Sequence, residues 1–308
     1  MVDYTVGVVG LGEIGSPIAR RLQKNGIEAG VCDPHALTQQ AFLAEGGRHP
    51  LATPLQLAQL SQVILLAMPD DPSLREVIIG NNGLMLGVKP GSVVVDLTST
   101  NPDLAQSLAN QLVSKGVHWV EASLLGSDRD IRLGQATLLV GGNGQVLDYL
   151  SPLFAAMSSA QIRTGGIGSA SLIKSMAGLL GGLQMAIHGE VLLMAKRAGI
   201  EPAIALQVMS ILSTLTGTPP ANLETQVFTR SFDSNYSLDR LILDIQRALV
   251  AARRNGTPAP LSAGLLETAL AARLNQGVSG DYTDIVKWQE KIAHAELHKQ
   301  SIVSNPVS

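Results

Sequence analysis

The hydrophobic pattern of the chain changes character near residue 165. Before that point, short continuous apolar runs alternate with amphipathic segments, as in 63–67 (VILLA) and 93–97 (VVVDL). Continuous runs of this length are typical of strands that are buried on both faces of a parallel sheet. We therefore expect strands at 6–9, 29–32, 63–67, 93–97, 117–122 and 136–140.

The segments between these runs have helical periodicity or helix-start signals. The expected helices lie at 37–45, 53–60, 74–79 and 102–115. Strands that alternate with helices form a mostly parallel, doubly wound α/β sheet. Ligands of such sheets bind at the carboxyl ends of the strands. The loops that this rule selects are 10–15, 67–70, 97–101 and 123–129.

From Ser169 onward, long helical patterns replace the strand patterns. The first, 169–198, predicts one helix of about 45 Å that ends at Gly199. Further helices are expected at 203–215, 238–255, 260–275 and 282–299. The predicted organisation is a dinucleotide-binding domain over 1–164, an all-helical domain over 165–300 and a polar tail over 301–308.

A glycine-rich turn follows the first expected strand and opens the first helix. Gly10, Gly12 and Gly15 have the G-x-G-x-x-G spacing. In that motif the first glycine makes the tight turn, the second lets the backbone approach a pyrophosphate, and the third allows close packing of helix and strand. The free N–H groups of the helix then face the phosphates. The predicted cofactor-binding residues of this turn are Gly10, Leu11, Gly12, Glu13, Ile14 and Gly15.

An acidic residue ends the second expected strand. Asp33 lies eighteen residues after Gly15, close to the spacing of a ribose ligand in a Rossmann-type domain. Its carboxylate would repel a 2′-phosphate, and no arginine occurs at 34–36, so NAD is favoured over NADP. The alternative is a structural βαβ turn that binds no ligand.

Composition and charge narrow the class of protein. The chain has 308 residues, 45% of them apolar and 15% charged, which suits a two-domain soluble enzyme. A net charge near −3 gives no reason to expect nucleic acid or an anionic membrane as partner. The most apolar stretch, 176–195, is interrupted by Gln184, His188 and Glu190, so we expect no membrane-spanning helix.

The cysteine and histidine residues predict neither a disulfide nor a metal site. Cys32 is the single cysteine and lies within an expected buried strand, and the six histidines have no ligand spacing. The first strand begins almost at Met1, without a charged-then-apolar leader. We therefore expect a cytoplasmic protein.

Motifs along nearly the whole chain resemble the β-hydroxyacid dehydrogenase family, whose members include 3-hydroxyisobutyrate dehydrogenase and 2-hydroxy-3-oxopropionate reductase. The glycine turn resembles the family's G-L-G-x-M-G, and Met68-Pro69-Asp70 its L-P-D loop. Asp96-Leu97-Thr98-Ser99 resembles D-M-S-T, and the segment 165–174 resembles G-x-G-x-x-x-K. The resemblance implies hydride transfer between NAD(H) and a small β-hydroxyacid or its semialdehyde.

The same resemblance implies roles for single residues. Lys174 would be the general acid for reduction and the base for oxidation, at a cleft between the domains. Met68, Pro69 and Thr98 would contact the cofactor, with Lys287 a further candidate. The substrate-binding candidates are Ser123, Gly126, Ser127, Gly178 and Asp244.

The chain departs from the family in the substrate half. The loop D-A-P-V-S-G-G is replaced by a segment in which Leu125 stands for the serine, although Ser127 could partly substitute. The asparagine after the catalytic lysine is Gly178, and the lysine of K-D-L is Leu243. These changes favour a divergent substrate over lost activity.

Each candidate residue also has an ordinary structural interpretation. Lys174 can be a lysine whose charged end reaches water from a helix flank. Gly178, with 181–182, can widen a substrate trough or let another helix approach closely. Thr98 can cap the following helix. Asp244 can form an ion pair with a neighbouring arginine on its own helix.

Two rival functions remain open on the sequence. An imine reductase of related architecture fits the less polar pocket, although those proteins generally carry another residue at the position of Lys174. A non-catalytic dinucleotide sensor or scaffold would bind NAD without turnover. In each case we expect a homodimer or homotetramer formed through the helical domain.

Overall fold

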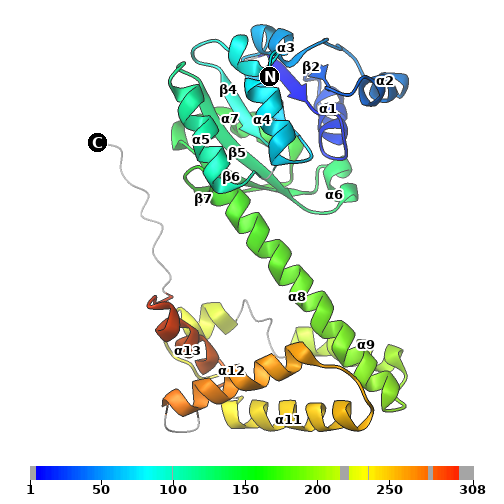
Figure 1. The fold of residues 1–308 in the computed structure, drawn as a ribbon, viewed down its shortest axis with the longest axis vertical. Coiled ribbons are helices and arrows are strands. Elements are labelled where there is room, and N and C mark those ends of the chain that lie inside the picture. The colour runs from blue at the N-terminus through cyan, green and yellow to red at the C-terminus, as the bar shows by residue number, and fades with distance from the viewer. Residues whose placement is uncertain (1–4, 99, 216–221, 235, 277–279, 298–308) are drawn as a thin grey trace. The chain divides into compact units, whose positions relative to one another are not determined.

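The structure is a computed structural model, and it describes residues 5–98, 100–215, 222–234, 236–276 and 280–297. The chain divides into two compact units, Met1–Leu179 and Leu180–Ser308. Figure 1 shows the sheet of the first unit and the helices of the second. The expected tail at 301–308 lies outside the described residues. The expected domain boundary near residue 165 stays a prediction.

A seven-stranded sheet forms the centre of the first unit, in the order β2-β1-β3-β4-β5-β6-β7. All neighbours are parallel except β5 and β6, which are antiparallel. The expected doubly wound α/β fold is therefore confirmed, as a mixed sheet. The strands are β1 (Val6–Val9), β2 (Ala29–Cys32), β3 (Val63–Leu66), β4 (Val93–Asp96), β5 (His118–Leu125), β6 (Thr137–Gly142) and β7 (Ala160–Gly165).

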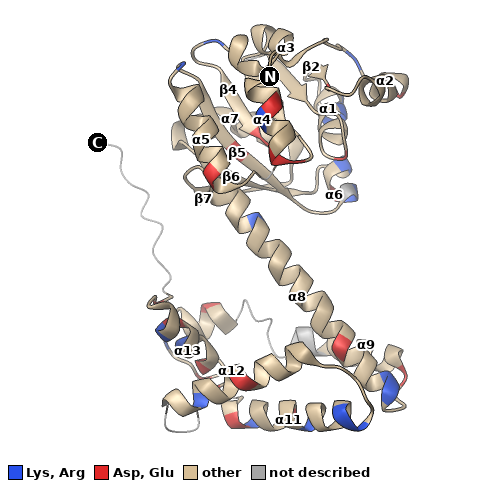
Figure 2. Cartoon of the chain, in the orientation of Figure 1, with Lys and Arg blue, Asp and Glu red and all other residues tan. Residues whose placement is uncertain are grey.

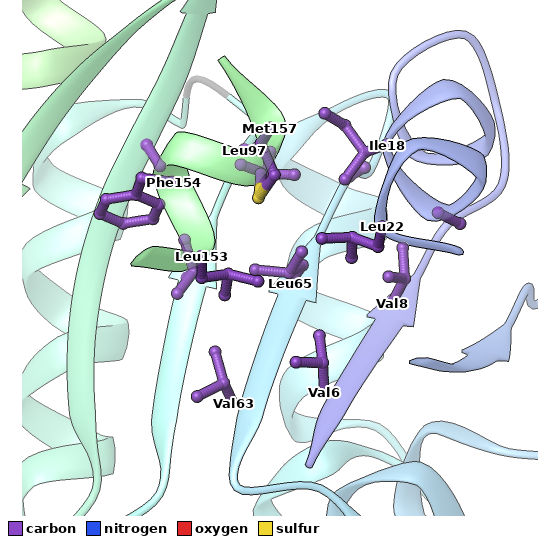
Figure 3. Close-up of a cluster of buried hydrophobic side chains, with 14 of the residues drawn as sticks. Val6, Val8, Ile18, Leu22, Val63, Leu65, Leu97, Leu153, Phe154 and Met157 are labelled. Atoms are coloured by element: carbon purple, nitrogen blue, oxygen red, sulfur yellow. The ribbon is translucent and has the colours of Figure 1, made fainter. Parts of the chain in front are cut away.

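Helices cover both faces of this sheet because successive strand residues point to opposite faces. Val6 and Val8 pack with helices α1 and α7, whereas Val9 packs on the other side with α3, α4 and α5. Figure 3 shows part of the first of these cores, in which Leu22 of α1 lies near Val8 of β1, and Leu153 and Phe154 of α7 belong to the same cluster. The helices are α1 (Gly15–Lys24), α2 (Ala36–Ala44), α3 (Pro54–Leu60), α4 (Asp71–Ile79), η1 (Leu84–Leu86), α5 (Pro102–Val113), α6 (Asp128–Leu133) and α7 (Gly144–Met157).

Several elements differ from the expectations of the sequence. Helices α6 and α7 and strand β7 were not expected. Strand β5 was expected to end at Ala122, but it continues to Leu125 because 120–125 pair with the antiparallel β6. The expected loop at 123–129 therefore begins three residues later than the hydrophobic run suggested. The expected helix at 282–299 is α13 (Asp284–Ala293) in the described residues.

The second unit contains amphipathic helices. In α11, Leu238, Ile242, Ile245 and Leu249 repeat at helical spacing and are buried. Leu238 and Ile242 form a core with residues of α12, and Ile285 and Trp288 of α13 pack against it. Glu190 accepts hydrogen bonds from the backbone N–H of Leu261 and from Ser262, and so caps the start of α12. The elements are α8 (Ser169–Arg197), which continues from the first unit, α9 (Pro202–Leu215), η2 (Leu223–Val227), α11 (Leu238–Arg254), α12 (Pro260–Gln276) and α13.

Helix α8 has few charged side chains (Figure 2). Among the described helices, it is the one long and apolar enough to cross a membrane by length and composition alone. This is weak evidence, because apolar helices of soluble proteins meet the same test. Glu190, inside the apolar part of α8, is 8% exposed and bonds to α12. That contact suits a helix packed on protein better than one in lipid.

The core of the first unit generates a stability prediction. Leu22 is fully buried, whereas Leu37 on α2 is 80% exposed. Leu22→Ala should lower the free energy of unfolding by about 2–5 kcal/mol, through lost burial and a residual cavity. Leu37→Ala should change it by less than about 0.5 kcal/mol. Denaturant unfolding followed by circular dichroism checks both, and equal effects would contradict the described core.

Candidate functional site

The glycine turn after β1 has the geometry that a dinucleotide requires. Gly10 has a φ of +89°, and a Cβ there would lie 2.3 Å from the carbonyl oxygen of Ala67. A Cβ on Gly15 would lie 1.7 Å from the carbonyl oxygen of Gly10. A Cβ on Gly12 would meet nothing within 4 Å. The first and third glycines therefore serve close packing, and the second leaves open space at the turn, as a phosphate-binding turn needs.

The start of α1 lies at this open space. None of the described side chains caps its N-terminus, at Ile14. The Ser16 N–H donates to the Gly12 carbonyl oxygen at 3.1 Å and Pro17 has no N–H, so the N–H groups that this turn can offer a ligand or water are ones that precede Ser16. Such N–H groups and the positive end of the helix dipole favour a phosphate. The Leu11 side chain is buried against the core, and Glu13 is exposed at the turn. The turn fits the predicted NAD(P) site.

Asp33 connects the end of β2 to the glycine turn. Its Oδ2 accepts a hydrogen bond of 2.6 Å from the N–H of Leu11, and its Oδ1 accepts one of 2.8 Å from His35. Each carboxylate oxygen keeps a further lone pair with which to accept from a ribose hydroxyl. Asp33 is thus placed for the predicted ribose contact and also holds the turn.

The ends of β3 and β4 meet next to this turn. The N–H of Met68 donates to Thr98 Oγ1 at 3.1 Å. A Cβ on Gly10 would come within 3.2 Å of Met68 Sδ, so the predicted cofactor residues of the two loops lie side by side. Pro69 follows Met68, and Asp70 caps α4 by accepting from the N–H of Ser73. Ser99 lies outside the described residues.

Two carboxyl groups are buried side by side, one at the end of β4 and one inside β5. Asp96 and Glu121 are register partners on these neighbouring strands, and both are fully buried. Burial raises the pKa of Asp96 to about 6, against hydrogen bonds from Thr100 and Thr98 that lower it, and the charge of Glu121 raises it further. The donors are Thr100 Oγ1 at 2.5 Å and the N–H of Thr98 at 2.8 Å.

Glu121 binds the start of α8. Its Oε2 accepts from the N–H of Gly168 and its Oε1 from the hydroxyl of Ser171, both at 2.6 Å. Lys174 follows one turn later and is half-buried. Burial lowers the pKa of its amine, and the nearby charge of Asp96 partly opposes this shift. An amine whose charged form is disfavoured by burial suits proton transfer near neutral pH better than an ordinary lysine does.

Neither Asp96 nor Glu121 was among the candidate residues expected from the sequence. A usable signal was present, because each is a single acid inside an otherwise apolar run, VVVDL and WVEA. An acid within a buried strand must find partners, and these partners prove to belong to α8 and to the loop after β4.

The substrate-loop candidates lie at the end of β5 and the start of α6. Ser123 is fully buried within β5. Gly126 has a φ of +152°, and Ser127 caps α6 in a reciprocal pair with Asp130. Ser127 Oγ accepts from the N–H of Asp130 at 3.3 Å, and Asp130 Oδ2 accepts from the N–H of Ser127 at 2.8 Å, which is the capping role. Leu125, where the family has serine, is 42% exposed.

Both interpretations of the glycines of α8, as a substrate trough and as a contact for another helix, stay predictions. Gly178 is exposed, and a Cβ there would meet no described atom within 4 Å; the same holds for Gly181 and Gly182. His188 bonds through Nδ1 to the carbonyl oxygen of Gln184, one turn earlier on the same helix. These positions leave space either for a ligand or for a second helix.

Asp244 and Lys287 belong to the second unit. Asp244 accepts from the hydroxyl of Tyr236 at 2.8 Å and lies 3.6 Å from Arg247, which is the ion pair that the sequence allowed. Lys287 Nζ lies 2.6 Å from Asp284 Oδ1 and 3.9 Å from the centre of the Phe232 ring.

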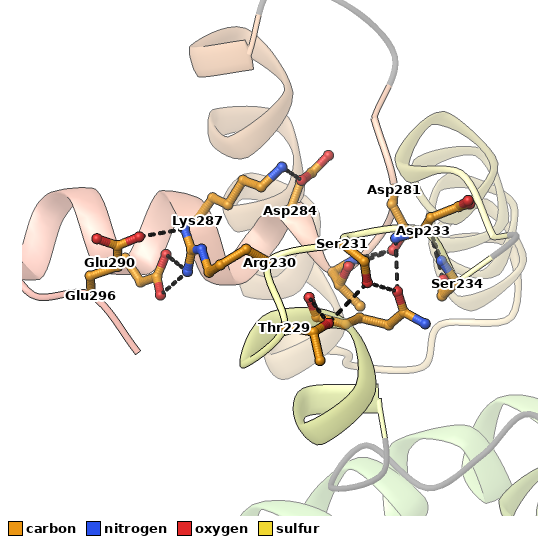
Figure 4. A network of polar contacts seen from close by, with 12 residues as sticks. Thr229, Arg230, Ser231, Asp233, Ser234, Asp281, Asp284, Lys287, Glu290 and Glu296 are labelled. Carbon is orange, nitrogen blue, oxygen red and sulfur yellow. Dashed lines mark hydrogen bonds and ion pairs between the residues drawn. The ribbon is translucent and has the colours of Figure 1, made fainter. Parts of the chain in front are cut away.

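Figure 4 shows Lys287 beside a second ion pair, in which Arg230 holds both oxygens of Glu290 at 2.7 and 2.9 Å. Both cations therefore already have acidic partners. The predicted substrate and cofactor roles of Asp244 and Lys287 stay predictions. Among the described residues, no group of three or more His, Cys, Asp and Glu side chains is placed to hold a metal ion.

Two family models cover most of the chain. The NAD binding domain of 6-phosphogluconate dehydrogenase matches residues 5–166. The model described as NAD-binding of NADP-dependent 3-hydroxyisobutyrate dehydrogenase matches residues 168–289.

Characterised relatives share a quarter of the sequence. The chain is 25% identical to 2-(hydroxymethyl)glutarate dehydrogenase of Eubacterium barkeri over 272 residues, 88% of each chain. It is 25% identical to 2-hydroxy-3-oxopropionate reductase of Escherichia coli K12 over 292 residues, 95% of this chain and 99% of the relative. The imine reductase of Myxococcus stipitatus in complex with NADP+ shares the fold, with a TM-score of 0.81, 17% identity and coverage of 92% and 99%.

The three glycines generate a binding prediction. Gly12→Ala places a methyl group in the open space of the turn and should weaken NADH binding at least about tenfold, which is about 1.4 kcal/mol. The melting temperature should stay unchanged. Gly15→Ala, the matched substitution, should lower the melting temperature because its methyl group meets the Gly10 carbonyl. Fluorescence titration and thermal unfolding measure both, and wild-type NADH affinity in Gly12→Ala would contradict a phosphate site here.

Proposed function

The chain belongs to the β-hydroxyacid dehydrogenase family of NAD(P)-dependent oxidoreductases, and we propose that it transfers a hydride between NAD(H) and a small β-hydroxyacid or its semialdehyde. The observation that supports this proposal is the half-buried Lys174, whose amine has its pKa lowered by burial and feels the charge of Asp96, on a helix whose first turn bonds to Glu121. The glycine turn, Met68 and Thr98 lie at the same carboxyl edge of the sheet.

Lys174 is the proton-transferring group of this proposal. The nicotinamide ring, when bound, supplies or accepts the hydride. In reduction, the Lys174 ammonium donates a proton to the carbonyl oxygen as negative charge develops there. In oxidation, the neutral amine accepts the proton of the hydroxyl group. Burial makes both forms accessible, since it lowers the cost of losing the proton.

We propose NAD as the preferred cofactor. Asp33 Oδ2 accepts from the Leu11 N–H of the glycine turn and Oδ1 from the His35 N–H, and the three residues that follow Asp33 offer no arginine for a 2′-phosphate. The substrate class follows the named relatives, which act on small hydroxyacids or their oxo forms. We propose that Ser123, Gly126 and Ser127 line its binding site.

The residues Leu125, Gly178 and Leu243 favour a substrate that is bulkier or less polar than those of the family. They replace polar residues of the family pattern by apolar or absent side chains. The same replacements support the second candidate, an imine reductase, whose fold this chain shares. Lys174 argues against that candidate, because an amine able to move a proton to or from an oxygen suits a carbonyl substrate. A non-catalytic NAD sensor is the third candidate.

We propose that a second copy of the chain covers the apolar surface of α8. Monomeric soluble proteins rarely expose large contiguous apolar patches. Exposed apolar side chains on this helix are Leu172, Ile173, Met176, Leu179, Leu180, Leu183, Met185, Val191 and Leu193. A helix of 29 residues that carries this many offers the self-complementary face that a homodimer requires.

The proposed mechanism predicts a strong effect at Lys174. Lys174→Ala should lower kcat by about 10²- to 10⁴-fold, because the proton donor is removed. The wild-type rate of reduction should fall as pH rises past the pKa of the Lys174 amine, which burial holds below its ordinary value. Nicotinamide absorbance measures both, on a panel of hydroxyacids, semialdehydes and cyclic imines with NAD(H) and NADP(H).

Lys196→Ala, an exposed lysine on the same helix, is the matched control and should leave kcat unchanged. NADH affinity should be normal in both variants. Near-normal turnover in Lys174→Ala would overturn the mechanism, and faster turnover of cyclic imines than of semialdehydes would favour the second candidate. NADH binding without any turnover would favour the sensor.

The oligomer proposal is tested at α8. Leu179 and Met185 are 65% and 75% exposed, and the double substitution Leu179→Glu with Met185→Glu should convert the dimer to a monomer in light scattering. Leu37→Glu, on an equally exposed leucine of α2, should not. A monomeric wild type, or one that partitions into lipid vesicles, would overturn the proposal.

A further inference from the structure

Two buried acids of the first unit need an explanation. Asp96 and Glu121 lie on neighbouring strands whose other side chains are mostly apolar, and both are removed from water. A buried carboxylate costs several kcal/mol unless donors or cations satisfy it. Two adjacent ones also repel each other, which raises the pKa of Asp96. Their contacts show what offsets this cost.

Glu121 is bonded to the start of α8 through both oxygens. The N–H of Gly168 and the hydroxyl of Ser171 each donate at 2.6 Å. Ser171 is 1% exposed, so its bond to Glu121 is shielded from water. The anionic side chain also faces the positive end of the α8 dipole. β5 is therefore attached to the first turn of the helix that carries Lys174.

The neighbouring strand makes room for this contact. A Cβ on Gly141 of β6 would lie 3.1 Å from Glu121 Oε2 and 2.9 Å from the carbonyl oxygen of Gly166. A side chain there would push the carboxylate and the turn before α8 apart. β5, β6 and the start of α8 can therefore lie this close because backbone atoms and the Glu121 carboxylate meet there, and Gly141 adds no side chain.

Ser171 and Lys174 lie on one face of α8, since they are three residues apart. The contact of Ser171 with Glu121 therefore holds the turn of α8 from which Lys174 projects. Asp96 is the register partner of Glu121, so it lies beside the carboxylate that reaches this turn, and its charge opposes the lowering of the Lys174 pKa by burial. The other partners of Asp96, Thr98 and Thr100, are neutral donors.

We propose that Asp96 and Glu121 are positioning residues for Lys174: Glu121 fixes the first turn of α8, and Asp96 supplies the counter-charge for the amine. This inference rests on the proposed function, because it assigns the two acids a purpose in proton transfer by Lys174. A merely structural role would use Glu121 only as a cap that stabilises α8, with no effect on the ionisation of the amine.

The direct test measures the amine without turnover. Full-length protein is treated with trinitrobenzenesulfonate over a range of pH, and the labelling rate of Lys174 is read by mass spectrometry, with the exposed Lys24 as internal reference. Asp96→Asn removes a charge that favours the ammonium form. At pH 8 the fraction of the Lys174 amine that is neutral should rise at least about threefold in Asp96→Asn, and the labelling rate of Lys174 relative to Lys24 should rise with it.

Glu121 is tested with a matched pair of serines on α8. Ser171→Ala removes one hydrogen bond to Glu121, whereas Ser175→Ala, one turn later, removes a bond to the backbone carbonyl of Ser171. Ser171→Ala and Glu121→Gln should lower kcat about tenfold or more, change the Lys174 labelling profile and leave the KM for NAD unchanged. Ser175→Ala should match the wild type. If Glu121→Gln fails to fold, Ser171→Ala decides the question alone.

The outcomes separate this inference from the proposed function. Wild-type labelling profiles in Asp96→Asn and Ser171→Ala overturn the inference, even where Lys174→Ala abolishes turnover. A lowered melting temperature with unchanged labelling and kcat would show a structural cap only, which also overturns it. Changed labelling profiles support the inference, and they can be read even if near-normal turnover in Lys174→Ala has refuted the proposed function.

Discussion

The parallel register of β1, β3, β4 and β5 is the constraint on which the candidate site depends. Val9 pairs with Leu66, Leu66 with Asp96, and Asp96 with Glu121, so β1, β3 and β4 end at the same level and Glu121 of β5 lies beside that level. The glycine turn, the Met68 loop and the two acids therefore meet at one edge, although they are far apart in the sequence. Each is too short to form a site alone, and the ladder of backbone hydrogen bonds brings them together.

The sequence predicted the parallel half of the sheet well because its strands are buried on both faces and lack polar interruptions. It did not predict β7, whose AQIRTG has no apolar run, nor the continuation of β5 beyond Ala122. Both arise from pairing with β6, a long-range contact that local periodicity does not contain. The long helix α8 was predicted almost to the residue, because Gly199 ends it in a left-handed conformation.

The cofactor half of the candidate site was predictable because its motif has fixed spacing, and Gly10 and Gly15 are both explained by contacts that a Cβ would break. The sequence did not identify Asp96 and Glu121 as partners of the helix that carries Lys174. The bond between Glu121 and Ser171 joins residues fifty positions apart, and only the packing of α8 on the sheet edge determines it. A capping role such as that of Ser127 depends equally on where β5 ends.

The double hydrogen bonding of Asp33 bears on how the cofactor preference of such a protein can change. If Asp33 only accepted a hydrogen bond from a ribose hydroxyl, a residue that binds a 2′-phosphate could replace it without affecting the rest of the turn. Here the same carboxylate ties Leu11 to the end of β2, beside the bond from the Gly10 N–H to the Cys32 carbonyl oxygen, so its replacement removes one of the hydrogen bonds that hold the glycine turn. A change of coenzyme at this position would therefore also loosen the turn, unless a second substitution restores the lost hydrogen bond. Redesign, whether by evolution or in the laboratory, then gains from pairing the two substitutions.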